Sequence, residues 1–358
     1  MKTILLLIYF VTTAVLSELF ALSYENVITG KIKDESTGDP LSYVNIFINN
    51  TTWGTTTDLN GSFKLFSICS GKYEIVFSMI GYETQSRIIN VGDKTEIFIE
   101  ILLHPKIYTT KEIDVIAERP EQWFEDLKDF KEKFFGYSSV PIKCSIENEY
   151  YLEFEHPHKN ILIAKCQVPL KIINYTFGYS ISCEVQKFEY DKWSKELKQK
   201  YRLYYSELDT SDVEIKQDWA QKRKKMYKKS LYYFLKTLIT KKMSETEFDI
   251  FLTGNVHAYN PSLGFNLQST DEILQKNDSA KTYILKFDDY LRVERYSNFY
   301  LASISWIKLN YPFITIDEYG YPVEDYAVTL FGSWAKSGIA SSLPKNFIIE
   351  QNKNYFEE

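Results

Sequence analysis

Residues 54–82, GTTTDLNGSFKLFSICSGKYEIVFSMIGY, decide the fold of the first part of the chain. The segment Asp58–Gly61 is typical of a turn, because its Asn-Gly pair tolerates a positive φ. Phe63 and Leu65 then begin a returning strand, and a second period-two face follows from Tyr73 to Met79. The stretch therefore predicts short strands joined by tight turns.

The same alternation continues on both sides of this stretch. Val44, Ile46 and Ile48 form a period-two face before it, and Ile97–Leu103 forms another after it. Several short strands with turn signals between them, from Val27 to Leu103, favour a β-sandwich.

The motifs of this region resemble a known family. In chain order they are Gly30–Asp34, Gly38–Leu41, Val44–Ile46, Gly54–Asp58, Asn60–Phe63, Gly71–Tyr73 and Ser78–Tyr82. On these motifs, residues 25–117 resemble a carboxypeptidase-regulatory-like domain. The resemblance implies a transthyretin-like, seven-stranded β-sandwich that serves as a structural or adaptor unit without activity of its own. It also implies kinship with Bacteroidetes proteins, where such domains stand at the N-termini of TonB-dependent receptors and surface proteins.

The segment Glu112–Ile116 resembles the strand that follows this domain in TonB-dependent receptors, where it leads to a plug and a barrel. The residues that remain here are too few for a receptor barrel of ~22 strands with about 10 residues each. Pro120 suits a first helical turn and Gly136 suits a helix stop. We therefore expect residues 118–136 to be a linker helix, helical from about Glu121 to Phe135.

Residues 137–350 carry mainly strand patterns. The expected strands are Glu149–Phe154, Ile161–Cys166, Leu170–Asn174, Tyr179–Phe188, Tyr201–Tyr205, Lys281–Lys286, Tyr290–Arg295, Ser303–Leu309, Phe313–Ile316 and Ala327–Phe331. Turns are expected at Asn174–Gly178 and at Asp317–Gly320.

Apolar residues at helical spacing from Tyr227 to Leu238 predict one long helix from about Val213 to Met243. The predicted fold class is therefore mainly β. A seven-stranded sandwich is followed by a β-rich α+β domain with one long helix.

The N-terminus has the features of a cleavable signal peptide over residues 1–23. Lys2 supplies a positive charge, Ile4–Phe10 is an apolar run, and Ala21–Ser23 offers small residues before a cut at Tyr24. A membrane anchor is the alternative, but this run and every later one fall short of the ~18 apolar residues of a membrane span. We expect an exported protein of the periplasm, the outer membrane or the cell surface. Peripheral association with the outer membrane stays open.

Composition limits the partners and the redox chemistry. A net charge of -6 and a pI near 5.5 argue against nucleic-acid binding. Export permits disulfides, but the four cysteines match no zinc motif. Cys69, Cys144, Cys166 and Cys183 are expected to be buried free thiols, with disulfide pairing as the alternative.

The histidines argue against a zinc carboxypeptidase site. Such a site needs a His and a Glu three residues apart and a second, distant His around an open metal position. None of His104, His156, His158 and His257 has a Glu at the third place, and the chain has no His-Glu-x-x-His. His156 and His158 could face one metal from the same side of a strand. A surface turn is expected instead, because a proline separates them.

Other catalytic signatures are missing or weak. The sequence has no Gly-x-Ser-x-Gly elbow and no phosphate-binding glycine loop. Carboxylates that could converge as a glycosidase pair are expected to lie in solvated turns and at strand edges. They are Glu147, Glu149, Asp288, Asp289, Asp317, Glu318, Glu324 and Asp325.

Two further groups are interpreted as structural. The basic run Lys222–Lys229 is expected to be a solvated helix face, although anionic lipid or glycan could contact it. Trp193, Trp219, Trp306 and Trp334 are expected in the core, although aromatic rings also stack on sugars.

No catalytic, cofactor-binding or metal-binding residue is assigned from the sequence, and no cofactor is expected. The sequence favours a non-catalytic binding or scaffolding protein of the cell envelope, with an envelope protein or a glycan as its partner. One alternative is an envelope enzyme that acts on glycan with its site in residues 137–350, and another is an accessory subunit of an outer-membrane transport system. Convergent carboxylates in a deep pocket would favour the enzyme, and a flat aromatic or edge-strand surface would favour the binding protein.

Overall fold

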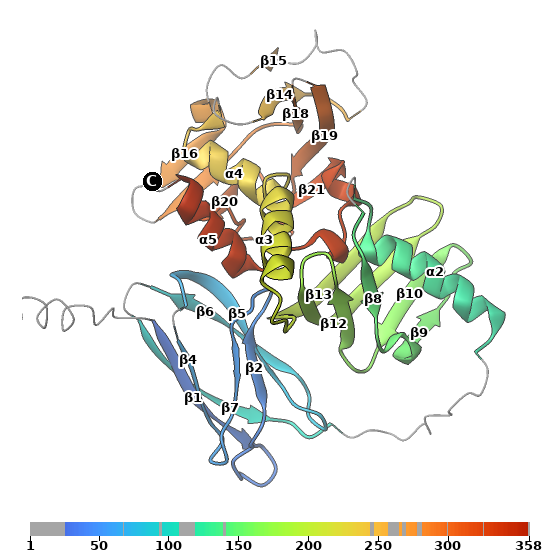
Figure 1. The fold of residues 1–358 in the computed structure, drawn as a ribbon, viewed down its shortest axis with the longest axis vertical. Coiled ribbons are helices and arrows are strands. Elements are labelled where there is room, and N and C mark those ends of the chain that lie inside the picture. Colours follow the sequence, from blue (N-terminus) through green and yellow to red (C-terminus); the bar gives the residue numbers. More distant parts are fainter. Residues whose placement is uncertain are drawn as a thin grey trace, which may run out of the picture. The chain divides into compact units, whose positions relative to one another are not determined.

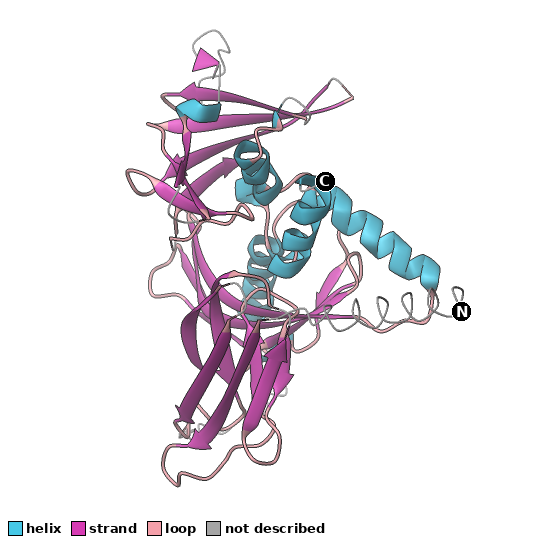
Figure 2. Cartoon of the chain, turned by 90° about the vertical axis from the view of Figure 1, so that its left-hand side faces the viewer, coloured by secondary structure: helices cyan, strands magenta, loops and turns pink. Residues whose placement is uncertain are grey.

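The computed structural model describes residues 26–66, 68–92, 95–106, 119–138, 141–243, 247–256, 265–266, 270–277, 281–298, 300–324 and 326–356. The chain divides into two compact units, one of Met1–Phe47 with Trp53–Tyr108 and one of Ile48–Thr52 with Thr109–Glu358. The expected signal peptide, the segment Glu112–Ile116 and His257 lie outside the described residues. Strands are more abundant than helices (Figure 2), which confirms the mainly β fold class.

The first unit is a β-sandwich of two sheets (Figure 1). Its strands are β1 (Val27–Asp34), β2 (Asn45–Ile48), β3 (Gly54–Thr56), β4 (Ser62–Phe66), β5 (Gly71–Ser78), β6 (Gln85–Val91) and β7 (Glu96–Leu103). One sheet has the order β4-β1-β7 and the other has the order β3-β2-β5-β6. The predicted seven-stranded sandwich is confirmed. Apolar alternation missed β3 because it is short, and β6 because it buries only Ile89 and Val91.

Alternating side chains explain the packing of these strands. Ile28 and Ile32 of β1 and Ile75 of β5 are fully buried, since residues at even spacing face the same side of a strand. The predicted turn at Asp58–Gly61 is present, and Gly61 has a φ of 70°. A Cβ atom on Gly61 would lie 2.5 Å from the Ile32 carbonyl oxygen, so this turn requires glycine.

The second unit begins with a helix packed on a sheet. Helix α2 (Glu121–Phe135) has the bounds that the sequence predicts. The sheet has the order β8-β11-β12-β10-β9, and β13 pairs with β12. Its strands are β8 (Cys144–Ile146), β9 (Leu152–Glu155), β10 (Ile161–Cys166), β11 (Leu170–Asn174), β12 (Tyr179–Asp191) and β13 (Leu197–Glu207). The Phe130 ring of α2 meets the Phe188 ring of β12 edge to face, with 4.7 Å between centroids.

The prediction of a strand at Glu149–Phe154 is wrong for its first half. Residues Glu149–Tyr151 form the 3-10 helix η1, and β9 starts at Leu152. Tyr150 and Tyr151 are both exposed, so the one-in, one-out alternation of a half-buried strand is absent there.

The prediction of a single long helix is also wrong. Two helices, α3 (Val213–Tyr227) and α4 (Leu231–Ile239), occupy this region (Figure 1). The Ser230 side chain accepts the backbone N–H of Tyr233 at 3.2 Å and so caps the start of α4. Helix α3 buries two residues, whereas α4 is buried over most of its length. The apolar face that suggested one helix therefore belongs mainly to α4.

Two further sheets and a last helix complete this unit. The first sheet has the order β15-β14-β18-β19-β21 and the second has the order β16-β17-β20. The strands are β14 (Phe248–Thr253), β15 (Phe265–Asn266), β16 (Leu274–Asn277), β17 (Thr282–Leu285), β18 (Tyr290–Ser297), β19 (Tyr300–Leu309), β20 (Ile314–Asp317) and β21 (Val328–Gly332). The other helices among the described residues of this unit are η4 (Thr270–Glu272), η5 (Trp334–Lys336), η6 (Ile339–Ser341) and α5 (Lys345–Phe356).

Helix α4 shares one apolar core with both of these sheets. The core joins Phe234 and Leu238 of α4 to Leu291 of β18, Ile307 of β19 and Ile314 of β20. No helix in the described part of the chain is long and apolar enough to cross a membrane.

Candidate binding surface

The paired histidines lie in a turn and do not converge on a metal. The Nε2 atom of His156 lies 2.8 Å from a carboxylate oxygen of Asp126, a buried residue of α2. The carbonyl of His158 accepts the backbone N–H of Ile161 within the turn. Within the described ranges, no three His, Cys, Asp or Glu side chains are grouped as a metal site.

Two of the carboxylates considered for a glycosidase pair, Glu147 and Asp317, have separate local roles. Glu147 forms an ion pair with Lys171 at 2.7 Å. The Asp317 carboxylate accepts the backbone N–H groups of Tyr319 and Tyr321 at 3.0 and 2.8 Å, which stabilises the predicted turn after β20. Asp325 lies outside the described residues. These contacts give the glycan-enzyme alternative no support.

No disulfide joins the four cysteines in the structure. Cys183 is buried as expected, but Cys69, Cys144 and Cys166 are half-buried, so the expectation of a buried position is wrong for these three. Burial raises the pKa of Cys144 to about 12 and also raises the pKa of Cys183. A thiolate is therefore disfavoured at both positions, and neither thiol is suited to nucleophilic attack.

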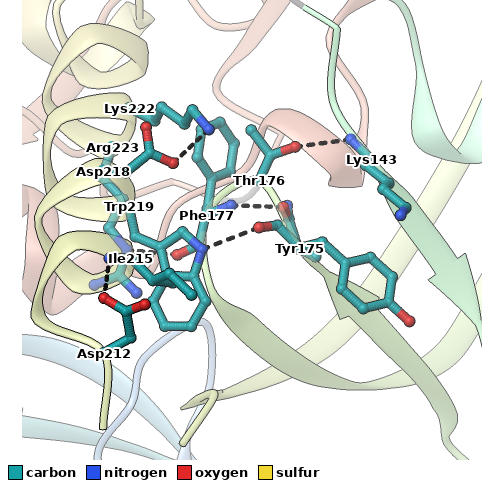
Figure 3. Close-up of polar contacts among 11 residues, drawn as sticks. Lys143, Tyr175, Thr176, Phe177, Asp212, Ile215, Asp218, Trp219, Lys222 and Arg223 are labelled. Atoms are coloured by element: carbon teal, nitrogen blue, oxygen red, sulfur yellow. Dashed lines mark hydrogen bonds and ion pairs between the residues drawn. The ribbon is translucent and has the colours of Figure 1, made fainter. Parts of the chain in front are cut away.

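Part of the basic run is structural. Arg223 of α3 is buried, and its guanidinium donates to the carbonyl oxygens of Phe177 and Gly178 at 2.7 and 3.3 Å. Its neighbour Lys222 pairs with Asp218 at 2.5 Å on the solvated side (Figure 3). Arg223 thus holds the predicted Asn174–Gly178 turn against α3.

Trp219 completes this turn. Its Nε1 atom donates to the Tyr175 carbonyl oxygen at 3.0 Å (Figure 3). Gly178 has a φ of 66°, and a Cβ atom there would lie 2.1 Å from the Trp219 ring. Glycine is required at this position by both the backbone conformation and the ring that covers it.

The other tryptophans divide between core and surface. Trp334 packs against the apolar core around α4, as expected. Trp193, however, is 82% exposed on the turn between β12 and β13, so the expectation of a core position is wrong for it. That turn is formed by Asp191, whose carboxylate accepts the Trp193 N–H at 2.8 Å.

Three large aromatic side chains lie exposed on the two connections that flank β20. Tyr311 and Phe313 follow β19, and Tyr326 precedes β21. Their exposed fractions are 46%, 50% and 64%. Large rings grouped on the surface are a feature of interaction sites. We call Tyr311, Phe313 and Tyr326 the aromatic loop surface.

One residue, Asn310, joins the two connections. Its Nδ2 atom donates to the Tyr326 carbonyl oxygen at 2.6 Å, and its backbone N–H donates to the Ala327 carbonyl oxygen at 3.0 Å. Its Oδ1 atom accepts from the Thr329 hydroxyl at 2.8 Å. These bonds fix the backbone on which Tyr311 and Tyr326 are presented.

Tyr326 adopts an unfavourable backbone conformation. Its φ is 53°, and the left-handed region costs a residue with a Cβ atom roughly 1–2 kcal/mol. Glu324 braces the same connection, since its carboxylate oxygens accept the Thr315 N–H at 2.9 and 3.1 Å. Strain of this kind persists only where the surroundings impose it, and it is frequent at ligand-binding sites.

Charged residues border the aromatic loop surface. Lys308 lies over the Tyr290 ring, with 5.6 Å from Nζ to the centroid. Asp289, which precedes β18, has a φ of 57°, and its carboxylate oxygen lies 4.0 Å from the position that a Cβ atom would take on Gly254, after β14. Asp288 and Asp289 are both exposed. Lys308 is therefore the charged residue near the end of β19, two residues before Asn310, whereas the Asp289 carboxylate lies toward β14.

The sequence interpretation missed this surface. Phe313 was expected to begin a strand, but β20 starts at Ile314 and Phe313 projects into solvent. Pro312 was the available signal, because a proline lacks the N–H that a strand ladder needs. Pro312 therefore favours a loop that ends just before β20.

Comparison with known proteins identifies the first domain. Residues 28–115 match the family model of the CarboxypepD_reg-like domain, so the chain carries this domain, as the sequence motifs indicated. No curated protein matches the chain.

Solved structures give weaker likenesses. The pilus 2b backbone protein of group B streptococcus is 18% identical over 23% of this chain and 41% of that chain, with a TM-score of 0.20. A cohesin–X-dockerin complex from Acetivibrio cellulolyticus is 22% identical over 32% of this chain and 78% of that chain, also with a TM-score of 0.20. A DUF3823 family protein from Bacteroides uniformis is 8% identical over 82% of this chain and 99% of that chain, with a TM-score of 0.17. TM-scores this low carry no conclusion about the activity or ligand of this chain.

Proposed function

We propose that this protein is a non-catalytic binding protein of the bacterial cell envelope and that it contacts its ligand through the aromatic loop surface. The observation that carries the proposal is that surface itself. Three exposed rings stand on two connections that Asn310 ties together, and Tyr326 is kept in a left-handed conformation.

Rigid aromatic presentation suits binding for two physical reasons. Tyrosine and phenylalanine supply a large contact area with few rotatable bonds, so little conformational entropy is lost when they are covered. Their backbone is already fixed by the bonds of Asn310 and Glu324, which lowers the ordering cost of association further. Exposed rings on a fixed backbone support a binding protein over an enzyme.

The envelope location rests on the N-terminal features and on the CarboxypepD_reg-like domain. N-terminal sequencing of the protein from its native host should start at or near Tyr24. An intact Met1 on a protein recovered from the cytoplasm would contradict the envelope location.

Ligand contact can be tested by co-sedimentation of the purified mature protein with isolated cell envelopes. The wild type should sediment with the envelopes, and a variant with Tyr311→Ala, Phe313→Ala and Tyr326→Ala should stay in the supernatant. Trp193→Ala is the matched control, because it also removes an exposed ring but lies in another sheet. Equal sedimentation of the wild type and the triple variant, or no sedimentation of the wild type, would refute the proposal.

A further inference from the structure

We propose that the exposed lysines at the C-terminal end of α3 attach the protein to membrane surfaces with anionic lipid headgroups. They are Lys224, Lys225 and Lys228, which we call the lysine face. This contact is separate from the aromatic loop surface, and it does not depend on the ligand proposed for that surface.

Helix α3 presents these lysines to solvent. Residues three and four positions apart share a side of a helix, so Lys228 lies on the same side as both Lys224 and Lys225. All three residues are exposed. The two residues that α3 buries are Arg223 and Tyr227. The burial of these two residues fixes the helix and leaves the lysine face turned outward.

Nearby carboxylates do not neutralise the lysine face. Three of them are each bonded to a cation outside it. The pairs are Asp218–Lys222, Glu207–Arg223 and Glu247–Arg295. Among the described residues, Lys224 and Lys225 form no ion pair. Their positive charge therefore remains available to a partner.

The next lysine along the chain, Lys229, responds to this positive charge. Burial lowers the pKa of Lys229, and the charges of Arg295 and Lys225 lower it further. Glu247 acts in the opposite direction but does not reverse the change. Cations that lower the pKa of a neighbour repel it, and an anionic surface that approaches relieves the repulsion. The end of α3 therefore favours an anionic partner over an uncharged one.

The chemistry of the cations favours a layer of headgroups over a single bound phosphate. Lysine carries a hydrated point charge with no fixed geometry, whereas the planar fork of arginine recognises individual phosphate groups. The arginine of this run, Arg223, is buried and bonds to backbone carbonyls. Clusters of basic residues on a helix bind anionic membranes through their summed charge, without specific geometry. Three lysines on one outward helix face match that mode of binding.

The charge of the whole chain makes this face distinctive. The formal net charge is -6, so an anionic membrane repels the molecule on average. Between Lys222 and Lys229, six of the eight residues are basic and none is acidic. We therefore expect an anionic membrane to be approached through α3.

The test is co-sedimentation of the mature protein with vesicles. Phosphatidylethanolamine is mixed with anionic phosphatidylglycerol or with uncharged phosphatidylcholine. The protein should bind only the anionic vesicles at about 0.1 M salt, where charges are screened over ~10 Å, and should be released at about 1 M, where screening acts over ~3 Å. Equal binding to both kinds of vesicle, binding that persists at high salt, or no binding would overturn the proposal.

Variants locate the contact. Lys224→Gln, Lys225→Gln and Lys228→Gln together should weaken binding to anionic vesicles at least about tenfold. The matched control is Lys187→Gln, Lys198→Gln and Lys200→Gln, which removes the same charge from exposed lysines of β12 and β13 and should bind like the wild type. Equal weakening of the two variants would overturn the proposal, because net charge and not the lysine face would then govern binding.

The same assay separates this proposal from the function of the aromatic loop surface. The triple alanine variant of that surface should bind anionic vesicles like the wild type. Loss of vesicle binding in the alanine variant, with the glutamine variant unaffected, would overturn the proposal and assign lipid contact to the rings. In the envelope assay, about 1 M salt screens the lysine face and leaves contact through the uncharged rings. Vesicle binding can therefore fail while the proposed function stands.

Discussion

Two segments of the second unit can be compared: the turn at Asn174–Gly178 and the connections around Asn310 and Tyr326. Each uses an asparagine side chain to hold the backbone, and each contains a residue with a left-handed φ. In the first turn that residue is Gly178, which lies under the Trp219 ring. In the second it is Tyr326, whose side chain is mostly exposed. At Gly178 packing requires glycine, because a Cβ atom would overlap the Trp219 ring, whereas Tyr326 keeps its side chain despite the backbone strain. The exposure of the Tyr326 ring supports the ligand contact proposed above.

The largest effect is expected at the packed turn. Gly178→Ala should lower the free energy of unfolding by about 3 kcal/mol, because its Cβ atom would be strained at a φ of 66° and would overlap the Trp219 ring. Urea denaturation followed by tryptophan fluorescence measures the change. In a Trp219→Ala background the same substitution should cost less, since only the backbone strain remains. An equal cost in both backgrounds would show that the ring does not restrict this position.

A slightly smaller effect is expected from the arginine that supports the same turn. Arg223→Met should cost about 2–3 kcal/mol, because the Phe177 carbonyl loses the guanidinium donor and the Gly178 carbonyl keeps the Leu208 N–H but loses its bond to Arg223. The control is Lys222→Met, which removes an exposed ion pair within α3 and should cost under about 0.5 kcal/mol. Similar costs for the two variants would contradict the structural role assigned to Arg223.

Replacing the buried asparagine of the packed turn should cost more stability than replacing the exposed asparagine of the aromatic loop surface. Asn174 is fully buried and bonds to the Phe177 N–H and the Ala340 carbonyl, so Asn174→Ala should cost about 2 kcal/mol. Asn310 is exposed, and Asn310→Ala should cost about 1 kcal/mol while it weakens ligand binding. Denaturation and the envelope assay together test this contrast. Unchanged binding by Asn310→Ala would indicate that the rings do not depend on its bonds.

The smallest effect, and the most specific one, is expected at Tyr326. Tyr326→Gly should leave stability unchanged or raise it by up to about 1 kcal/mol, because glycine adopts a φ of 53° without steric strain. It should also reduce ligand binding. Tyr311→Gly is the matched control: it removes a neighbouring ring, but it should lower stability by about 0.5–1 kcal/mol because Tyr311 has no left-handed strain to relieve. A clear loss of stability in Tyr326→Gly would mean that the tyrosine ring is retained for packing.

Local patterns predicted the elements that depend on neighbouring residues. The sandwich, the turn at Asp58–Gly61 and the bounds of α2 follow from side-chain alternation, from an Asn-Gly pair, and from a proline and a glycine at the helix ends. Helical spacing also placed helix in the region of α3 and α4. It could not locate the break at Ser230, because the cap and the different burial of the two helices depend on what each of them packs against.

The sequence by itself determined the fold class and the family of the first domain, because period-two faces and turn residues act over short distances along the chain. Only the tertiary structure decided which side chains meet. It placed His156 beside Asp126, Arg223 on the carbonyls of a distant turn, and Asn310 between two connections. It also distinguished the exposed rings of Tyr311, Phe313 and Tyr326 from the many buried aromatic residues. Exposure depends on every element that folds around a residue, and composition alone does not contain that information.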